Sequence, residues 1–187
     1  YIADVSLLAK NHGIKTHLDG ARLWNASVAT GIEIKEYAKH FDSVSLCLSK
    51  GLGAPVGSVL CGSAEFIEKA RKYRKILGGG MRQGGVLAAA GLYALKNNIN
   101  RLSEDHKRAK YLAEVLRGIP TVEIDMDSVQ TNIVIFGFHS PKIDLEKIVS
   151  DLKDGGILVS RGTKGKLRIV THLDISDSDV DVAAEAF

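Results

Sequence analysis

The fold is decided by residues 14–61, which read IKTHLDGARLWNASVATGIEIKEYAKHFDSVSLCLSKGLGAPVGSVLC. Short apolar runs alternate here with a helical pattern, and this alternation is typical of the βαβ units of α/β proteins. The runs at 14–18, 41–48 and 57–61 predict strands, and the segment that ends near Gly31 predicts a helix. The last run lacks polar alternation, which predicts a strand buried on both faces.

Downstream of these strands the sequence predicts three helices. Ser63 is a suitable N-cap for the first helix, which ends at the glycine triplet 78–80. The second helix, at 84–95, is rich in alanine and almost uncharged, which predicts that it is deeply buried. The third helix is charged and amphipathic and covers residues 103–116.

Beyond Pro120 the pattern becomes strand, strand, helix, strand, strand, helix, which is typical of a compact α+β subdomain. We therefore predict two parts, residues 1–100 and 101–187. The chain begins at Tyr1 and ends at Phe187 within helical patterns, so we expect a fragment of a longer protein. In the second part, the strands are predicted at 122–126, 133–138, 157–160 and 166–170, and the helices at 143–152 and from 176 onward.

The composition is that of an ordinary globular protein and argues against several classes of partner. Of the 187 residues, 45% are hydrophobic and 25% are charged. The net charge of +3 is spread along the chain, which argues against a nucleic-acid partner. Two cysteines do not make a disulfide framework, and no metal-ligand spacing is present. No leader and no membrane-spanning stretch is visible, so we expect a cytoplasmic protein with no membrane partner.

Two residues at strand ends could carry chemistry together. Lys50 leads into a glycine-rich segment that allows close approach of a ligand, where a desolvated amine can act as a nucleophile. Asp19 ends an earlier strand, where a carboxylate can keep a pyridinium nitrogen protonated. Taken alone, Lys50 would be interpreted as a surface lysine and Asp19 as a helix N-cap. Taken together, they can flank one crevice at the carboxyl ends of the strands, which favours a pyridoxal-5′-phosphate (PLP) site.

The same segments resemble the threonine aldolases, which are PLP-dependent enzymes of the aspartate-aminotransferase fold (fold type I). Four motifs in the family's order make the resemblance specific, and together they extend over essentially the whole chain. The resemblance implies an α/β fold in which 1–100 is the C-terminal part of the PLP-binding large domain and 101–187 is a small α+β domain. The motifs are HLDGARL at 17–23, SKGLGAPVGS at 49–58, GGGMRQ at 78–83 and LRIVTH at 167–172.

The resemblance also implies a role for each matching residue. Lys50 would form the Schiff base with PLP, and Asp19 would be the partner of the pyridine nitrogen. Arg22 would lie beside the cofactor and contact its 3′-oxygen or the substrate carboxylate. Arg168 would bind the substrate α-carboxylate, for which a planar guanidinium is well suited. Without the motifs, Arg22 would be interpreted as a cation on a helix surface and Arg168 as an exposed strand residue.

Further residues of the motifs are assigned on weaker grounds. Arg82 and Lys75 lie next to the glycine triplet, which the family places near the cofactor phosphate, often that of the neighbouring subunit. The triplet alone is equally consistent with a simple loop. Ser49 is interpreted as a structural neighbour of the lysine, or as a contact of the phosphate. His17 and His172 are interpreted as structural.

The implied reaction is retro-aldol cleavage of L-threonine or L-allo-threonine to glycine and acetaldehyde by a homodimer or homotetramer. In the family, the ring-stacking residue, the phosphate loop and the base that acts on the hydroxyl come from the N-terminal half. We therefore expect this chain to be inactive alone. Two alternatives stay open. One is another fold-type I PLP lyase or aminotransferase, and the other is a non-catalytic remnant that serves in oligomerisation.

Overall fold

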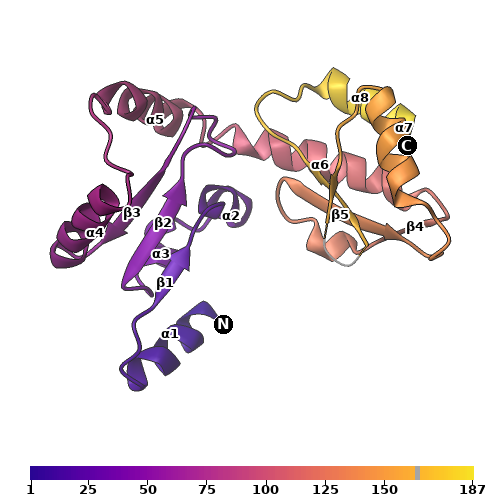
Figure 1. Ribbon diagram of the computed structural model, residues 1–187. Helices are drawn as coiled ribbons and strands as arrows, with labels where there is room; N and C mark the ends of the chain where they lie inside the picture. Colours follow the sequence, from indigo (N-terminus) through magenta and orange to yellow (C-terminus); the bar gives the residue numbers. More distant parts are fainter. Residues whose placement is uncertain (163–164) are drawn as a thin grey trace. The chain divides into compact units, whose positions relative to one another are not determined.

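The computed structural model describes residues 1–162 and 165–187, which form two compact units (Figure 1). The first unit is Tyr1–Asn100 and the second is Arg101–Phe187. The first unit combines a mixed sheet with helices, and the second is an antiparallel sheet with helices on one face. The mixed α/β class predicted from the sequence is confirmed.

The first unit is built on a three-stranded sheet in the order β1-β2-β3. Strand β1 (His17–Asp19) runs parallel to β2 (Ser43–Cys47), and β3 (Ser58–Gly62) runs antiparallel to β2. The predicted strand, helix, strand order is confirmed, although α3 was not predicted. The helices are α1 (Ile2–Asn11), α2 (Leu23–Thr30), α3 (Ile34–Ala38), α4 (Ala64–Ile76) and α5 (Gly85–Asn97).

Local signals in the sequence set the ends of two of these helices. Gly31 ends α2 with φ of 71°, a left-handed conformation that glycine adopts without steric cost. Ser63 begins α4, and its hydroxyl accepts a hydrogen bond from the Phe66 N–H at 3.2 Å. Both boundaries agree with the sequence prediction.

The core of the first unit lies between β2 and the helices that follow β1. Leu23 of α2 packs with Val44 and Leu46 of β2, all buried, and residues of α3 complete the cluster. Because β1 and β2 are neighbours in the sheet, this packing holds α2 and α3 against the two strands.

Two predictions of burial in this unit are wrong. Every residue of β3 is exposed, with Val59 at 42% and Leu60 at 39%, although the strand was predicted to be buried on both faces. In α5 only Gly91 and Ala94 are buried, while Val86 is 76% exposed. The physical reason is that β3 is an edge strand, and the described residues supply no second layer over it or over most of α5.

The second unit is an antiparallel four-stranded sheet in the order β4-β5-β7-β6. The predicted order of strands and helices is confirmed, but β6 is shorter and begins later than the predicted strand at 157–160. A 3-10 turn, Met126–Ser128, lies between the first two strands. The strands are β4 (Val122–Ile124), β5 (Ile133–Phe138), β6 (Ser160–Arg161) and β7 (Leu167–Val170), and the helices are α6 (Leu102–Arg117), α7 (Leu145–Asp154) and α8 (Asp177–Ala186).

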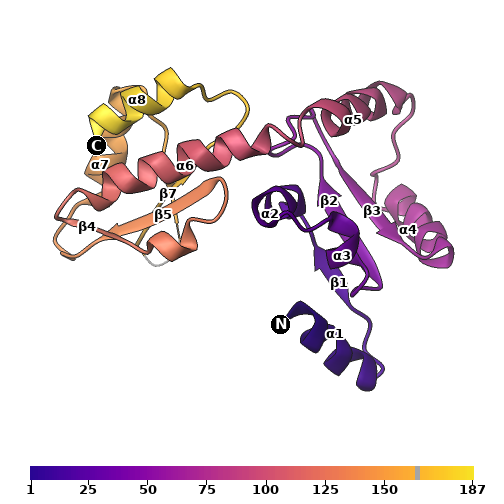
Figure 2. The same cartoon turned by 180° about the vertical axis from the view of Figure 1, so that it is seen from behind.

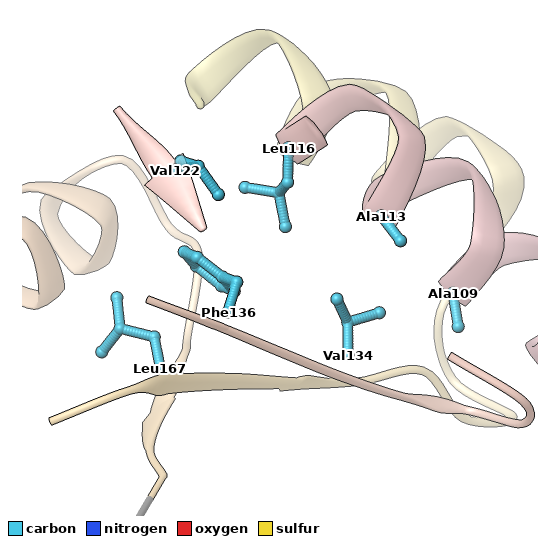
Figure 3. Close-up of a cluster of buried hydrophobic side chains, with 7 residues drawn as sticks. All are labelled: Ala109, Ala113, Leu116, Val122, Val134, Phe136 and Leu167. Atoms are coloured by element: carbon cyan, nitrogen blue, oxygen red, sulfur yellow. The ribbon is translucent and has the colours of Figure 1, made fainter. Parts of the chain in front are cut away.

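The core of the second unit lies between one face of this sheet and the helices (Figures 1 and 2). Figure 3 shows that side chains of α6 point toward Val134 and Phe136 of β5. Burying a side chain of the size of leucine or phenylalanine contributes about 1.5–3 kcal/mol, so this cluster dominates the stability of the unit. Side chains of β5 and β7 that alternate with the core residues point to the opposite face of the sheet. Arg168 is one of them.

A buried charge ties α6 to the sheet and to α8. The Asp105 side chain is fully buried and accepts hydrogen bonds from the terminal nitrogens of Arg101. Arg108 lies 3.9 Å from Asp105 and donates from Nε to Asp177 of α8 at 2.6 Å. The Asp105 carbonyl accepts a hydrogen bond from the buried Thr171 hydroxyl at 2.6 Å. The ion pairs therefore connect α6 to α8, and the Thr171 hydrogen bond connects α6 to the end of β7.

None of the helices in residues 1–162 and 165–187 combines the length and the apolar character needed to cross a lipid bilayer. In the same residues, no group of three or more histidine, cysteine, aspartate and glutamate side chains is arranged to hold a metal ion.

Candidate active site

Asp19 is the last residue of β1, and its side chain is exposed at the carboxyl end of the strand. Its Oδ1 accepts a hydrogen bond from the Ala21 N–H at 3.1 Å, an arrangement that fixes the carboxylate by its own backbone. The residue before α2 is Arg22, so Asp19 is not the N-cap of that helix. The turn after β1 thus holds the carboxylate in place at the carboxyl end of the strand.

Gly20 allows β1 and β2 to stay close at this end of the sheet. Its N–H donates to the Ser45 carbonyl at 2.8 Å, and a Cβ at this position would lie only 2.8 Å from the same oxygen. A larger residue would therefore push the two strand ends apart. We conclude that the glycine after Asp19 is required by the close approach of the backbone.

Lys50 lies in the loop between β2 and β3, three residues after β2 ends at Cys47. The loop is held by backbone hydrogen bonds from Leu48 to the Gly57 carbonyl and from Ala54 to the Leu48 carbonyl, each 3.0 Å long. Leu52 is buried to 1% exposure, while Lys50 is exposed. The loop therefore buries Leu52 and Ala54 and leaves the Lys50 side chain exposed.

Asn98, just after α5, gives the lysine loop a further support that the sequence did not reveal. Its Nδ2 donates a hydrogen bond to the Leu52 carbonyl at 2.7 Å, across 46 positions of the sequence. This contact could not have been predicted from the sequence, because it depends on how α5 packs.

Asp19 and Lys50 both follow the chain to the carboxyl ends of the parallel strands β1 and β2. In the parallel pair of β1 and β2, Asp19 lies opposite Ser45, and Lys50 follows Ser45 by five residues in the direction of the strand. Ligands of α/β sheets bind beyond the carboxyl ends of parallel strands. Within the described residues, no carboxylate lies within ion-pair distance of the Lys50 amine. The amine is thus available for a ligand.

Arg22 and Ser49 are two further predicted site residues of the first unit. Arg22 is half-buried and lies three residues after Asp19, so it belongs to the same edge. The Ser49 hydroxyl donates to the Gly57 carbonyl at 3.4 Å, which fits its interpretation as a structural neighbour of the lysine. Its contact with a phosphate stays a prediction.

Arg82 and Lys75 lie at the loop between α4 and α5. Lys75 is in the last turn of α4, and its side chain lies against Gly80, where a Cβ would be 3.1 Å from the Lys75 Cδ. The Arg82 side chain is exposed and makes no hydrogen bond or ion pair with the part of the chain that the structure describes. The structure does not bring Arg82 into contact with Asp19 or Lys50, so its cofactor role stays a prediction.

Arg168 lies on β7 in the second unit and is half-buried. Its Nε donates a hydrogen bond to the Ser160 Oγ at 3.1 Å. Among the described residues, it is the one arginine of this unit that has no carboxylate within 4.0 Å; the others are paired as Arg101–Asp105, Arg108–Asp177, Arg117–Glu114 and Arg161–Glu146. A half-buried guanidinium with no carboxylate partner among the described residues is suited to an anionic ligand.

The two histidines of the motifs make local hydrogen bonds. The His17 Nδ1 lies 2.8 Å from the Ser43 Oγ on the neighbouring strand, and the His172 Nδ1 accepts from the Asp174 N–H at 3.3 Å. These contacts fit the interpretation of both residues as structural.

The residues at the edge of the first sheet fit pyridoxal phosphate. A primary amine can bind the aldehyde carbon, and a carboxylate fixed by a backbone N–H can accept a hydrogen bond from a protonated ring nitrogen. The glycine-rich loop after Lys50 leaves room beside the amine. The donor set therefore suits an aromatic cofactor that carries an aldehyde and a basic ring nitrogen.

The chain is similar to known threonine aldolases. The chain is 48% identical to the low-specificity L-threonine aldolase 1 of Arabidopsis thaliana, with 100% of this chain and 52% of that protein aligned. It is 40% identical to the low specificity L-threonine aldolase of Escherichia coli K12, with 98% of this chain and 54% of that protein aligned. The chain thus spans about half the length of these relatives. The resemblance to threonine aldolases predicted from the motifs is confirmed.

Solved structures share the fold. A protein from an Exiguobacterium species, described provisionally as an aromatic amino acid beta-eliminating lyase/threonine aldolase, matches with a TM-score of 0.78 at 23% identity, over 100% of this chain and 56% of that one. A NifS-like protein from Rickettsia africae matches with a TM-score of 0.68 at 21% identity, over 100% of this chain and 56% of that one.

The strongest assignment comes from a family model that covers most of the sequence. The model of the beta-eliminating lyases matches residues 1–138, which include β1, β2 and the lysine loop. This chain belongs to the beta-eliminating lyase family.

Proposed function

We propose that this chain is the lysine-bearing half of a PLP-dependent aldehyde-lyase that cleaves L-threonine or L-allo-threonine to glycine and acetaldehyde. The observation that carries the proposal is the placement of Asp19 and Lys50 at one edge of a parallel strand pair. The names of the relatives support the substrate class. The complete enzyme would also contain a segment that corresponds to the other half of these relatives. The chain alone would be inactive.

Each residue at the edge of the first sheet has a task in this proposal. Bound pyridoxal phosphate supplies an electron sink when the Cα–Cβ bond of the substrate breaks. The Lys50 amine would hold the cofactor covalently. The Asp19 carboxylate would accept a hydrogen bond from the ring nitrogen and keep the proton on that atom. Four further residues are proposed to contact the cofactor: Arg22, Ser49, Lys75 and Arg82. Arg22 could instead contact the substrate carboxylate.

Arg168 orients the substrate. Its planar guanidinium can bind both oxygens of the α-carboxylate, which fixes the direction of the Cα–Cβ bond. The absence of a carboxylate partner among the described residues supports this role, since an anion from outside the chain would supply the missing charge.

Replacing Arg168 with alanine in the complete enzyme is expected to raise KM for threonine about 100-fold, because truncating one partner of a hydrogen-bonded charge pair costs about 2–5 kcal/mol. Steady-state kinetics of aldehyde release measure this change. The matched control is Arg161→Ala on the neighbouring strand, because Arg161 is exposed and already paired with Glu146. Arg161→Ala should leave KM within about twofold. Equal KM values for the two variants would contradict the role of Arg168.

Replacing Asp19 with asparagine removes the negative charge and keeps the shape of the side chain. We expect kcat to fall about 10³-fold, as for other residues that control a proton in the transition state, because the ring nitrogen loses its proton. The measurement is kcat of the PLP-loaded enzyme. Asp42→Asn is a suitable control, since Asp42 is paired with Lys15 at the opposite end of the strands. Near-full activity of the Asp19 variant would argue against a PLP site here.

One assay tests the proposed reaction against its alternatives. The complete enzyme is incubated with threonine, and acetaldehyde release is measured beside amino transfer to a keto acid. Acetaldehyde with glycine supports the proposal, while amino transfer would favour another PLP enzyme of this fold. A protein that does not bind PLP would favour an oligomerisation role. We further propose that the complete enzyme is a cytoplasmic homodimer or homotetramer.

A further inference from the structure

The hydroxyl of Ser160 makes two hydrogen bonds to one residue, Arg168. Strands β6 and β7 are antiparallel, and their register places Ser160 directly opposite Arg168. The Ser160 Oγ accepts from the Arg168 Nε at 3.1 Å and donates to the Arg168 carbonyl at 3.2 Å. The serine therefore binds the side chain and the backbone of the same residue at once.

This arrangement decides which guanidinium atoms remain for a ligand. A guanidinium carries five N–H donors, one on Nε and two on each terminal nitrogen. A carboxylate can bind it side-on, through Nε and one terminal nitrogen, or end-on, through both terminal nitrogens. Because Ser160 already occupies Nε, the side-on geometry is blocked. Only the end-on fork is open.

The surroundings of the guanidinium leave that fork open. Arg168 and Ser160 lie on the sheet face opposite the core, and the residue across β5 from Arg168 is Ile135, whose side chain is 40% exposed. Neither terminal nitrogen of Arg168 makes a hydrogen bond or an ion pair within residues 1–162 and 165–187. An approaching anion therefore meets two terminal nitrogens that no described residue occupies.

We propose that Ser160 is a positioning residue for substrate recognition: it fixes the Arg168 guanidinium so that the α-carboxylate binds end-on. This inference rests on the proposed function, because it assumes that Arg168 binds the substrate carboxylate. Ser160 itself touches no substrate atom. Its effect is on the freedom of the arginine, which would otherwise have to be ordered each time a substrate binds.

The first test compares two substitutions of the same shape in the complete PLP-loaded enzyme. Ser160→Thr keeps the hydroxyl, and Ser160→Val replaces it with a methyl group; both residues are β-branched and suit a strand. Ser160→Val is expected to raise KM for threonine about tenfold with little change in kcat, since it removes a hydrogen bond to a charged group. Ser160→Thr should stay within about threefold of the parent enzyme. Equal KM values for the two variants would overturn the inference.

A double-variant cycle shows whether the effect acts through the arginine. In an Arg168→Ala background, Ser160→Val should change KM no further, because the group that it positions is gone. An effect of full size in that background would overturn the inference. If Arg168→Ala raises KM and Ser160→Val does not, only the role of Ser160 fails. If Arg168→Ala leaves KM unchanged, the carboxylate role of Arg168 and this inference fail together.

A second readout does not depend on activity. In the cofactor-free complete protein with ¹⁵N-labelled arginine, the Arg168 Nε–H signal should exchange slowly with water in the parent protein and in Ser160→Thr. It should exchange fast in Ser160→Val and in Ser160→Ala, which serves as the second variant if valine impairs folding. A signal that exchanges equally in all four proteins would overturn the inference.

Discussion

Replacing Lys50 with alanine is expected to lower aldehyde release by the complete enzyme by more than about 10³-fold, because the variant has no amine at the point where the chain would hold the cofactor. The loop itself should survive, since its hydrogen bonds come from the backbone and its buried side chains are Leu52 and Ala54. The loss would therefore be chemical and not structural. The measurement is the rate of acetaldehyde release at saturating threonine and PLP.

Two further substitutions separate the amine from its charge. Lys50→Arg keeps a positive charge but not a nucleophilic amine, so it should be as inactive as the alanine variant. Lys39→Ala removes another exposed lysine of the same unit, one that is paired with Glu36, and should leave activity unchanged. An active Lys50→Arg enzyme would mean that only the charge of this residue matters, and the proposed role of Lys50 would be wrong.

The second large effect concerns stability. Replacing Asp105 with alanine is expected to lower the free energy of unfolding by about 3–5 kcal/mol, because it leaves two arginines without their buried partner. Arg101 and Arg108 are only 14% and 15% exposed, so neither guanidinium can recover its full hydration in the folded state. Urea unfolding of the complete enzyme, followed by circular dichroism, measures the change.

The matched control for Asp105 is the exposed end of the same network. Asp177 pairs with Arg108, but its side chain is 85% exposed. Asp177→Ala should therefore cost no more than about 1 kcal/mol, the range of surface ion pairs. If the two variants were equally stable, burial of the carboxylate would not be what makes this network important.

Much of the order of elements could be predicted because its signals are local. Gly31 ends α2, Ser63 caps α4, and Ser176 caps α8 with a capping box, and each of these residues acts on the few positions beside it. Burial could not be predicted in the same way. Whether β3 is covered depends on a second layer, which residues far away in sequence or outside the chain must supply.

The candidate site shows the same division. Asp19 and Lys50 could be placed near strand ends from the apolar runs that precede them; Asp19 is the last residue of β1, and Lys50 lies three residues beyond β2. Ser160 could not be found, because its contact with Arg168 depends on the register of β6 against β7. A shift of one residue would turn the serine to the other face of the sheet. Asn98 was missed for a related reason, since its partner is 46 positions away.

The most direct test of the central claim is to reduce the complete enzyme with borohydride in the presence of PLP and to map the modified peptide. The account predicts a stable pyridoxyl label on Lys50, which would identify both the cofactor and the residue that holds it. A label on another lysine, or no label, would contradict the assignment of this loop as the cofactor site.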